Sequence, residues 1–201
     1  MKNLNIGLLG GTFNPVHNAH LWLADTLIKT NKLDEIWFIP AYLPPHKDKI
    51  YTVSMATANH RLGMLKIALR GKKQFHVKTL EIERGGKSYT YDTIKTFKKT
   101  SPNLNLFFII GSDLLQELFT WYKIDKLCKM VTFLAVRRKG FTIPSKNFLN
   151  KYNVKVVKLN GIRDVSASMI RESIYNSESV KGLIPDDVYR YIVAHKVYST
   201  H

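Results

Sequence analysis

The sequence has little cysteine, little acidic charge and no long apolar run, and each shortage excludes a class of protein. The single cysteine, Cys128, rules out an internal disulfide, which fits a reducing cytosol. No run of about 18 apolar residues is present, so we expect no membrane-spanning helix. The first apolar run is short and ends at Gly10-Gly11, unlike that of a secretory signal peptide. We therefore expect a cytoplasmic protein without a membrane partner.

Acidic residues are scarce: 15 Asp and Glu stand against 31 Lys and Arg, and the net charge is +16. Such a surplus fits binding to nucleic acid, acidic lipid or a polyanionic small molecule. A general bias toward lysine explains it equally well. The basic residues are dispersed, and the tightest groups, 98–99 and 137–139, form no long basic arm. Charge alone therefore does not predict a nucleic-acid partner.

Short apolar runs alternate with amphipathic runs along the 201 residues. The expected strands are 6–9, 36–39, 75–79, 106–110, 132–136 and 154–159. The expected helices are 19–29, 56–69, 90–99, 114–120, 168–175 and 186–195. This alternation favours a parallel sheet covered by helices. We predict one α/β domain over residues 1–201, with a C-terminal helical part from about 165 to 201.

Polar and glycine-containing segments follow several of the expected strands. They are 10–20, 40–47, 111–113 and 137–138. The carboxyl ends of parallel strands share one edge of a sheet, and ligands bind at that edge near a switch in strand order. We therefore expect these four segments to form one site.

The segment Gly10–His20, GGTFNPVHNAH, joins the first expected strand to the first expected helix. Backbone N–H groups at a glycine turn and a helix N-terminus attract anions. His17 and His20 can face the same side of the first helical turn, so a polyphosphate is the favoured ligand. His20 can donate a hydrogen bond to an α-phosphate, and His17 can hold the β- and γ-phosphates. Zinc is the alternative, but no third ligand has compact spacing nearby.

Two further segments place basic side chains where they can meet an anion, one in a proline-containing loop and one at the start of a helix. The stiff loop Pro44-Pro45-His46-Lys47 ends in two groups that can meet a phosphate, although an ordinary surface loop has the same composition. Ser166 or Ser168 can cap a helix that carries Arg171 one turn in. That helix start is either a second anion site or simple capping beside a surface arginine.

Three residues near the fourth expected strand have more than one interpretation each. Asp113 can accept ribose hydroxyls, help to place a magnesium ion, or cap the helix 114–120. Trp121 and Tyr122 can stack on a flat aromatic ring or pack in the core.

Taken together, these segments resemble a known family. Gly10–His20 and 165–171 resemble the signatures GGTF(D/N)PxHxxH and ISSTxIR of the nucleotidyltransferase superfamily. Residues 81–93, EIERGGKSYTYDT, resemble the E-x-x-R-x-G-x-SYTxDT segment of the bacterial nicotinate-nucleotide adenylyltransferases. The resemblance extends to 44–47, 111–113, 121, 138–140 and 184–195, and so covers essentially the whole chain.

The resemblance implies a Rossmann-like parallel sheet with helices on both faces. It also implies a reaction without a covalent intermediate, in which an acceptor phosphate attacks the α-phosphate of ATP and pyrophosphate leaves. Mg²⁺ takes part, bound through the ATP phosphates and not by a metal site of the protein.

The resemblance also assigns roles to residues of this chain. Those implied for ATP are Gly10, Gly11, Thr12, Phe13, His17, His20, Gly111, Asp113, Ser166, Ser168 and Arg171. Those implied for nicotinate mononucleotide are His46, Lys47, Thr90, Trp121, Tyr122 and Arg138. The implied catalytic groups, which stabilise charge, are His17, His20, Lys47 and Arg171.

The chain departs mildly from the family pattern. Asn14 stands for the commoner aspartate, Ala19 for glycine, Ala167-Ser168 for Ser-Thr, and Lys139 for proline. None of these changes removes a group that the chemistry needs.

We therefore predict adenylyl transfer from ATP to nicotinate mononucleotide, a step of NAD synthesis, by a monomer or homo-oligomer without a nucleic-acid partner. Phosphopantetheine and glycerol phosphate are alternative acceptors, against which 88–93 and Trp121 argue. Nicotinamide mononucleotide is a third. A basic nucleic-acid-binding domain without catalysis is the alternative from another class of protein.

Overall fold

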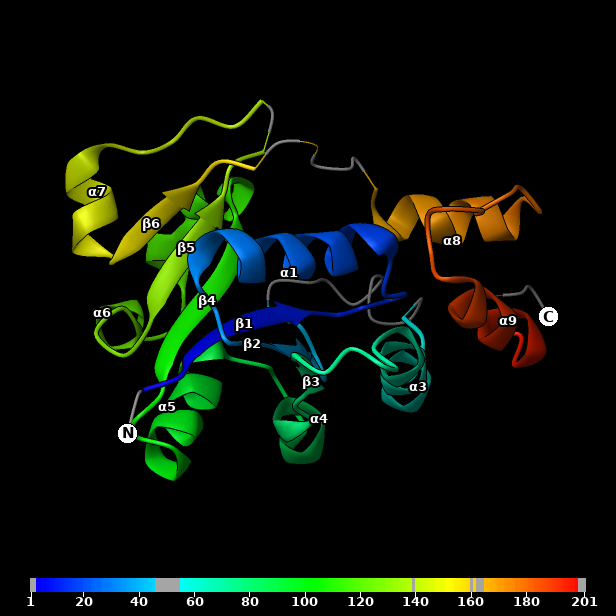
Figure 1. Cartoon of the computed structure of the whole chain (residues 1–201), viewed down its shortest axis with the longest axis horizontal. Coiled ribbons are helices and arrows are strands. Elements are labelled where there is room, and N and C mark those ends of the chain that lie inside the picture. Colours follow the sequence, from blue (N-terminus) through cyan, green and yellow to red (C-terminus); the bar gives the residue numbers. More distant parts are fainter. Residues whose placement is uncertain (1–2, 46–54, 139, 160, 162–164, 199–201) are drawn as a thin grey trace.

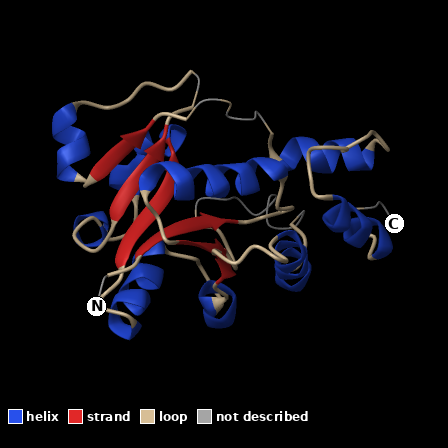
Figure 2. Ribbon diagram, viewed as in Figure 1, coloured by secondary structure: helices blue, strands red, loops and turns tan. Residues whose placement is uncertain are grey.

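A six-stranded sheet forms the centre of the computed structural model, which describes residues 3–45, 55–138, 140–159, 161 and 165–198 (Figure 2). In sheet order the strands are β3 (Phe75–Val77), β2 (Glu35–Pro40), β1 (Asn5–Gly11), β4 (Asn105–Gly111), β5 (Thr132–Val136) and β6 (Val154–Val157). Every neighbouring pair is parallel. The α/β class and the six expected strands are confirmed.

Helices connect the strands. Those described are α1 (Asn18–Asn31), α3 (Ala58–Ala68), α4 (Leu80–Arg84), α5 (Thr90–Thr100), the 3₁₀ helix η1 (Ser112–Thr120), α6 (Ile124–Leu127), α7 (Lys146–Lys151), α8 (Ala167–Tyr175) and α9 (Asp186–Ala194). Every expected helix is found, although η1 begins two residues earlier than expected. The helices α4, α6 and α7 were not expected, because four to six residues are too few to show a 3.6-residue period.

The side chains of the sheet alternate between two cores. Phe108 of β4 packs in the core that includes α5 and α6, whereas its neighbour Ile109 packs in the core that includes α1 and α3. Figure 1 shows α1 on one face of the sheet and α5 on the other. Burial on both faces explains why the strands read as continuous apolar runs.

The strand order reverses between β1 and β4, because β2 extends the sheet from one side of β1 and β4 from the other. The register pairs Gly11 with Pro40 and Gly111 with Val136. The carboxyl ends of these strands therefore lie at one edge, as the sequence predicts, and their loops meet at the switch point where ligands bind in such sheets.

The helices α8 and α9 lie at the end of the molecule toward which β1 points (Figure 1). Ile170 of α8 and Val188 of α9 are fully buried and belong to the core that also includes α1. The division of the chain into one domain with a C-terminal helical part stays a prediction. Within the described residues, no helix has the length and apolar character needed to cross a bilayer.

Candidate active site

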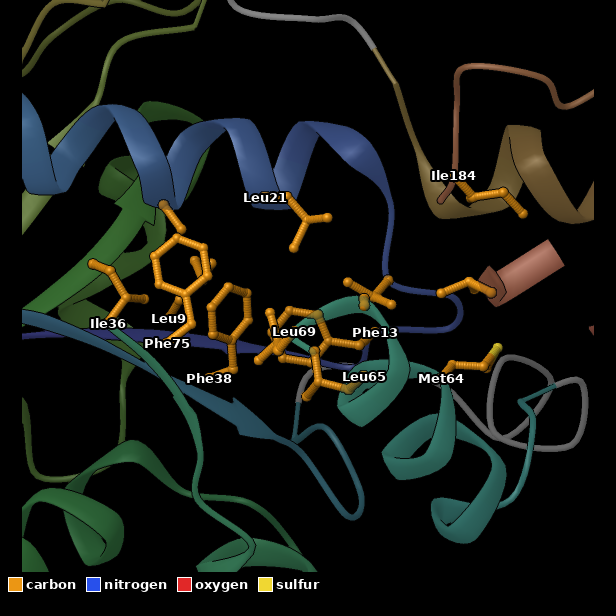
Figure 3. Close-up of a cluster of buried hydrophobic side chains, with 14 of the residues drawn as sticks. Leu9, Phe13, Leu21, Ile36, Phe38, Met64, Leu65, Leu69, Phe75 and Ile184 are labelled. Atoms are coloured by element: carbon orange, nitrogen blue, oxygen red, sulfur yellow. The ribbon is translucent and has the colours of Figure 1, made fainter. Parts of the chain in front are cut away.

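The turn between β1 and α1 is anchored by the ring of Phe13, which is 2% exposed. Figure 3 shows this ring in the core with Leu65 of α3 and with Leu69, the residue that follows this helix. The turn leaves no room for side chains at its glycines: a Cβ on Gly10 would lie 3.1 Å from the Phe108 ring, and one on Gly11 3.3 Å from the Phe13 ring. The backbone is thus held tightly at the edge of the sheet.

His17 and His20 stack against each other at the start of α1. Their ring centroids lie 3.7 Å apart with an interplanar angle of 24°, as expected for residues on one side of the first turn. The backbone N–H of His17 donates to His20 Nδ1 at 3.3 Å. Because this nitrogen accepts a hydrogen bond, the proton of a neutral His20 sits on Nε2.

The histidine pair is neutral at pH 7. Burial, assisted by nearby Arg138, lowers the pKa of His17 from 6.5 to about 4. Burial, then His17 and then Arg138 hold the pKa of His20 well below its usual value. A neutral imidazole still has one N–H to donate. The pair therefore offers hydrogen-bond donors to an anion, while full positive charge comes from neighbouring side chains.

Arg138 and Asp113 form an ion pair beside the histidines, with the guanidinium 3.2 Å from Asp113 Oδ2. The backbone N–H of Arg138 donates to the buried Ser112 Oγ at 2.9 Å, which ties the ends of β4 and β5 together. A Cβ on Gly111 would lie 2.0 Å from Asp113 Oδ1, so any other residue there would displace the Asp113 carboxylate.

The second carboxylate oxygen of Asp113, Oδ1, is buried and accepts no hydrogen bond within the part of the chain that the structure describes. Such an acceptor suits a hydroxyl donor. The alternative role as a helix cap is wrong, because η1 begins immediately after Gly111 and Asp113 lies inside its first turn.

The second signature is bonded directly to the first. Ser166 is the N-cap of α8, and its hydroxyl accepts the Met169 N–H at 3.1 Å. Arg171 donates to Ser168 Oγ at 3.2 Å and to the backbone carbonyl of Asn14 at 2.8 Å. Tyr198 donates to the side-chain oxygen of the same Asn14 at 2.9 Å. Two residues that are 157 and 184 positions away in the sequence therefore meet at Asn14 of the first signature.

An aromatic cavity of about 300 Å³ opens at the ends of β1 and β4. One wall is the glycine turn 10–12, and the others include Thr90, Phe108, Trp121 and Tyr122. Trp121 packs edge-on against Phe108 and Phe133, with both centroid distances 6.0 Å, so it serves the core and lines the cavity at once. Tyr122 is 42% exposed and lies against Tyr89.

A second cavity of about 530 Å³ lies at the ends of β5 and β6. Its lining combines the cations Arg137, Arg138 and Lys158 with the apolar Phe141 and Leu159. Arg138 lines this cavity and not the aromatic one. The ion pair that Arg138 forms with Asp113 therefore lies at the second cavity.

Two buried charged residues of the site have no role in the sequence analysis. Glu81 lines the aromatic cavity and accepts a hydrogen bond from Thr93 Oγ1 at 2.6 Å, and burial raises its pKa. Arg61 of α3 is 1% exposed. Its spacing of four and seven residues from the buried Leu65 and Ala68 places it on the apolar face of the helix, which is the signal that could have identified it.

His46, Lys47 and Lys139 lie outside the described residues. Within the described ranges, no three histidine, cysteine or carboxylate side chains gather closely enough to hold a metal ion.

Comparison with known proteins identifies the family. The model of the cytidylyltransferase-like family matches residues 8–173. A Bacillus subtilis protein named nicotinate-nucleotide adenylyltransferase is 40% identical over 196 residues, covering 97% of this chain and 98% of its own length. The chain belongs to the nicotinate-nucleotide adenylyltransferases of this family.

Further members of the family agree in sequence and structure. A Bacillus licheniformis protein named "Probable nicotinate-nucleotide adenylyltransferase" is 42% identical, covering 97% of this chain and 98% of its own. The solved Plasmodium falciparum nicotinic acid mononucleotide adenylyltransferase, complexed with NaAD, superposes with a TM-score of 0.81 at 25% identity and 98% coverage of both chains. The resemblance and the Rossmann-like fold expected from the sequence are thus confirmed.

Proposed function

We propose that the protein transfers the adenylyl group of ATP to nicotinate mononucleotide, giving nicotinate adenine dinucleotide and pyrophosphate. The observation that carries this proposal is a shared wall: the glycine turn 10–12 also bounds the aromatic cavity. An aromatic mononucleotide seated in that cavity would present its phosphate to the turn, where backbone N–H groups favour the triphosphate. Donor and acceptor phosphates would then meet at the edge of the sheet.

In the proposed reaction, an oxygen of the acceptor phosphate attacks the α-phosphorus of ATP. The bond from that phosphorus to the oxygen bridging to the β-phosphate breaks, and its electron pair leaves with pyrophosphate. The acceptor phosphate is largely ionised at neutral pH, since the second pKa of such a monoester is about 6, so no general base is needed. Catalysis rests on positioning and on stabilising charge.

The donor side of the site would hold ATP through Gly10 to Phe13 and the two histidines. His20 Nε2–H would donate to the α-phosphate, and His17 to the β- and γ-phosphates. The neutral state of both rings supports these roles, because each keeps a donor without charge repulsion between the stacked rings. The buried Asp113 Oδ1 would accept a ribose hydroxyl.

The second signature would complete the donor side, with Ser166 and Ser168 near the adenylate. Arg171 is held at the first signature by its bond to Asn14, where it would add positive charge beside the phosphates. Lys47 would do the same from the loop after β2. Arg138 would meet the mononucleotide phosphate, since it brings a guanidinium to the second cavity and its backbone is held beside the end of β4 by Ser112.

On the acceptor side, Trp121 and Tyr122 would bind the pyridine ring. Thr90 is the first residue of α5, and the N–H at this position has no partner within the helix. A helix N-terminus favours a carboxylate over a neutral amide, which supports nicotinate over nicotinamide mononucleotide as acceptor. His46, in the loop after β2, belongs to the same proposal.

We include Mg²⁺ in the proposal as an ion bound through the ATP phosphates. When bound, it would neutralise phosphate charge and assist the departure of pyrophosphate. As the alternative to accepting a ribose hydroxyl, the unpartnered oxygen of Asp113 would help to orient the ion. A cytoplasmic location is also part of the proposal and rests on the scarcity of cysteine.

The proposal is tested by measuring pyrophosphate release from ATP and Mg²⁺ with three acceptors in parallel: nicotinate mononucleotide, nicotinamide mononucleotide and phosphopantetheine. We expect the highest kcat/KM with nicotinate mononucleotide. Equal or greater use of either alternative would overturn the assigned acceptor.

A further inference from the structure

The side chain of Arg61 is buried, yet its guanidinium donates hydrogen bonds to four backbone carbonyls. Nε donates to Ala56 O at 3.0 Å, one terminal nitrogen to Thr12 O at 2.8 Å and to Ala41 O at 2.6 Å, and the other to Tyr42 O at 3.3 Å. With 1% of the residue exposed, these bonds are shielded from water and correspondingly strong.

The carbonyls that Arg61 binds belong to separate loops of the site. Thr12 lies in the donor turn, by which we mean residues 10–13. Ala41 and Tyr42 lie in the β2 loop, residues 41–45, and Ala56 precedes α3. Thr12 and Ala41 both line the aromatic cavity. One rigid, planar group therefore joins two walls of that cavity from behind.

The β2 loop passes this connection on to the acceptor segment, residues 88–91. The N–H of Tyr42 donates to Ser88 Oγ at 2.9 Å, and the N–H of Ser88 donates to Leu43 O at 2.9 Å. Because C=O and N–H point to opposite sides of a trans peptide, the Ala41–Tyr42 peptide is held by Arg61 on one side and by Ser88 on the other. Its orientation is fixed from both directions.

We propose that Arg61 is a positioning residue that fixes the donor turn and the acceptor segment relative to each other. The inference rests on the proposed function, because it concerns the alignment of ATP with its acceptor. Arg61 lies behind the turn and acts through the backbone carbonyls of Thr12 and Ala41. It does not itself contact the reacting groups. In-line transfer depends on this alignment, since a displacement of about 1 Å can cost about a hundredfold in rate.

The test compares Arg61→Lys with Met64→Ala. Lysine keeps the charge but has a single donor atom, so it cannot span the carbonyls that the guanidinium fork reaches. Met64 lies one turn further along α3, is fully buried and has no bond to the loops, so its truncation destabilises the same helix without freeing them. Steady-state kinetics of both variants are measured per folded molecule, at a temperature below both melting transitions.

For Arg61→Lys we expect kcat to fall at least tenfold and KM to rise for both ATP and acceptor, while Met64→Ala keeps both parameters within twofold. A merely structural arginine would lower the melting temperature and leave kcat per folded molecule unchanged, and that result would overturn the proposal. An equal loss of kcat in Met64→Ala would overturn it too.

Ser88→Ala supplies a second test that does not depend on the folding of Arg61→Lys. This change removes the hydrogen bond between the Tyr42 N–H and Ser88 Oγ, which joins the β2 loop to the acceptor segment. We therefore expect the KM for the acceptor to rise while the KM for ATP stays within twofold. An unchanged acceptor KM would contradict the proposed connection. If wild-type protein prefers another acceptor, the proposed function fails, and the Arg61 comparison is made with that acceptor.

Discussion

The imidazole rings of His17 and His20 lie face to face, 3.7 Å between centroids, and the backbone N–H of His17 bonds to the ring of His20. Two charged rings at this distance would repel each other in a buried place. The stacked arrangement therefore disfavours charge on both rings at once, and burial lowers the pKa of each ring. The N–H that His20 can donate is the one on Nε2.

The first prediction follows from that donor. His20→Ala removes an N–H aimed at the charge that develops on the α-phosphate, and we expect kcat to fall about a hundredfold to a thousandfold. Pyrophosphate release at saturating substrates measures the effect. His195→Ala, at an exposed histidine after α9, is the matched control and should turn over normally. Near-normal turnover by His20→Ala would remove its assigned role.

The second prediction concerns stability at acid pH. The pKa of His17 is 6.5 in the unfolded chain and about 4 in the folded protein, so the unfolded state binds the proton more tightly. The stability that neutral His17 provides is complete above pH 6.5 and declines as the pH falls toward 4. At pH 5 the loss is about 2 kcal/mol.

Urea unfolding at pH 7.5 and pH 5 measures this loss. His17→Asn has no group that titrates in this range, so its free energy of unfolding should fall by about 2 kcal/mol less than that of the wild type between the two pH values. An identical pH dependence in both proteins would show that His17 does not carry the effect.

The third prediction uses the close approach of Gly111 to Asp113. The backbone of Gly111 has an ordinary φ of −76°, so alanine is opposed by steric contact with Asp113 Oδ1 and not by backbone strain. We expect Gly111→Ala to destabilise the protein by about 1–3 kcal/mol. In a double-mutant cycle, the same change in an Asp113→Ala background should cost much less. If the losses of stability in the two single variants simply add up in the double variant, the methyl group added at position 111 is in steric contact with another group than Asp113.

The fourth prediction separates the two aromatic residues of the acceptor cavity. Trp121 packs against Phe108 and Phe133, so Trp121→Ala should lower the free energy of unfolding by about 3 kcal/mol. Tyr122 is largely a surface residue, so Tyr122→Ala should leave stability nearly unchanged. If both rings bind the acceptor, both variants should raise its KM about tenfold, since stacking contributes about 1–3 kcal/mol.

The KM for ATP is the internal control of this comparison and should stay within twofold in both variants. A rise in the acceptor KM for Trp121→Ala alone would assign ring binding to the tryptophan and release Tyr122 from that role.

Much of the fold was predictable because burial on both faces makes parallel strands apolar throughout. β4 is the clearest case: Leu106, Phe108 and Ile110 point to one core and Ile109 to the other. The shared edge was predictable too, since parallel strands all end on the same side. The short helices α4, α6 and α7 were not, because they hold too few residues for a period to appear.

The parts of the site that depend on residue type could be predicted from the sequence. The properties that depend on burial in the folded protein could not. Glycines and histidines after β1 indicate an anion site without any tertiary information. The neutrality of His17 and His20 depends on burial and on Arg138, more than 100 residues away. The bonds of Arg61 depend on where the loops after β1 and β2 come to lie. Local sequence contains neither fact.

The bonds that converge on Asn14 also bear on protein synthesis. Arg171 and Tyr198, which bond to the carbonyl and side-chain oxygens of Asn14, follow it in the chain by 157 and 184 residues. A growing chain therefore cannot assemble this corner of the donor site before Tyr198 has been synthesised. Chains that stop before Arg171 would lack both bonds to Asn14.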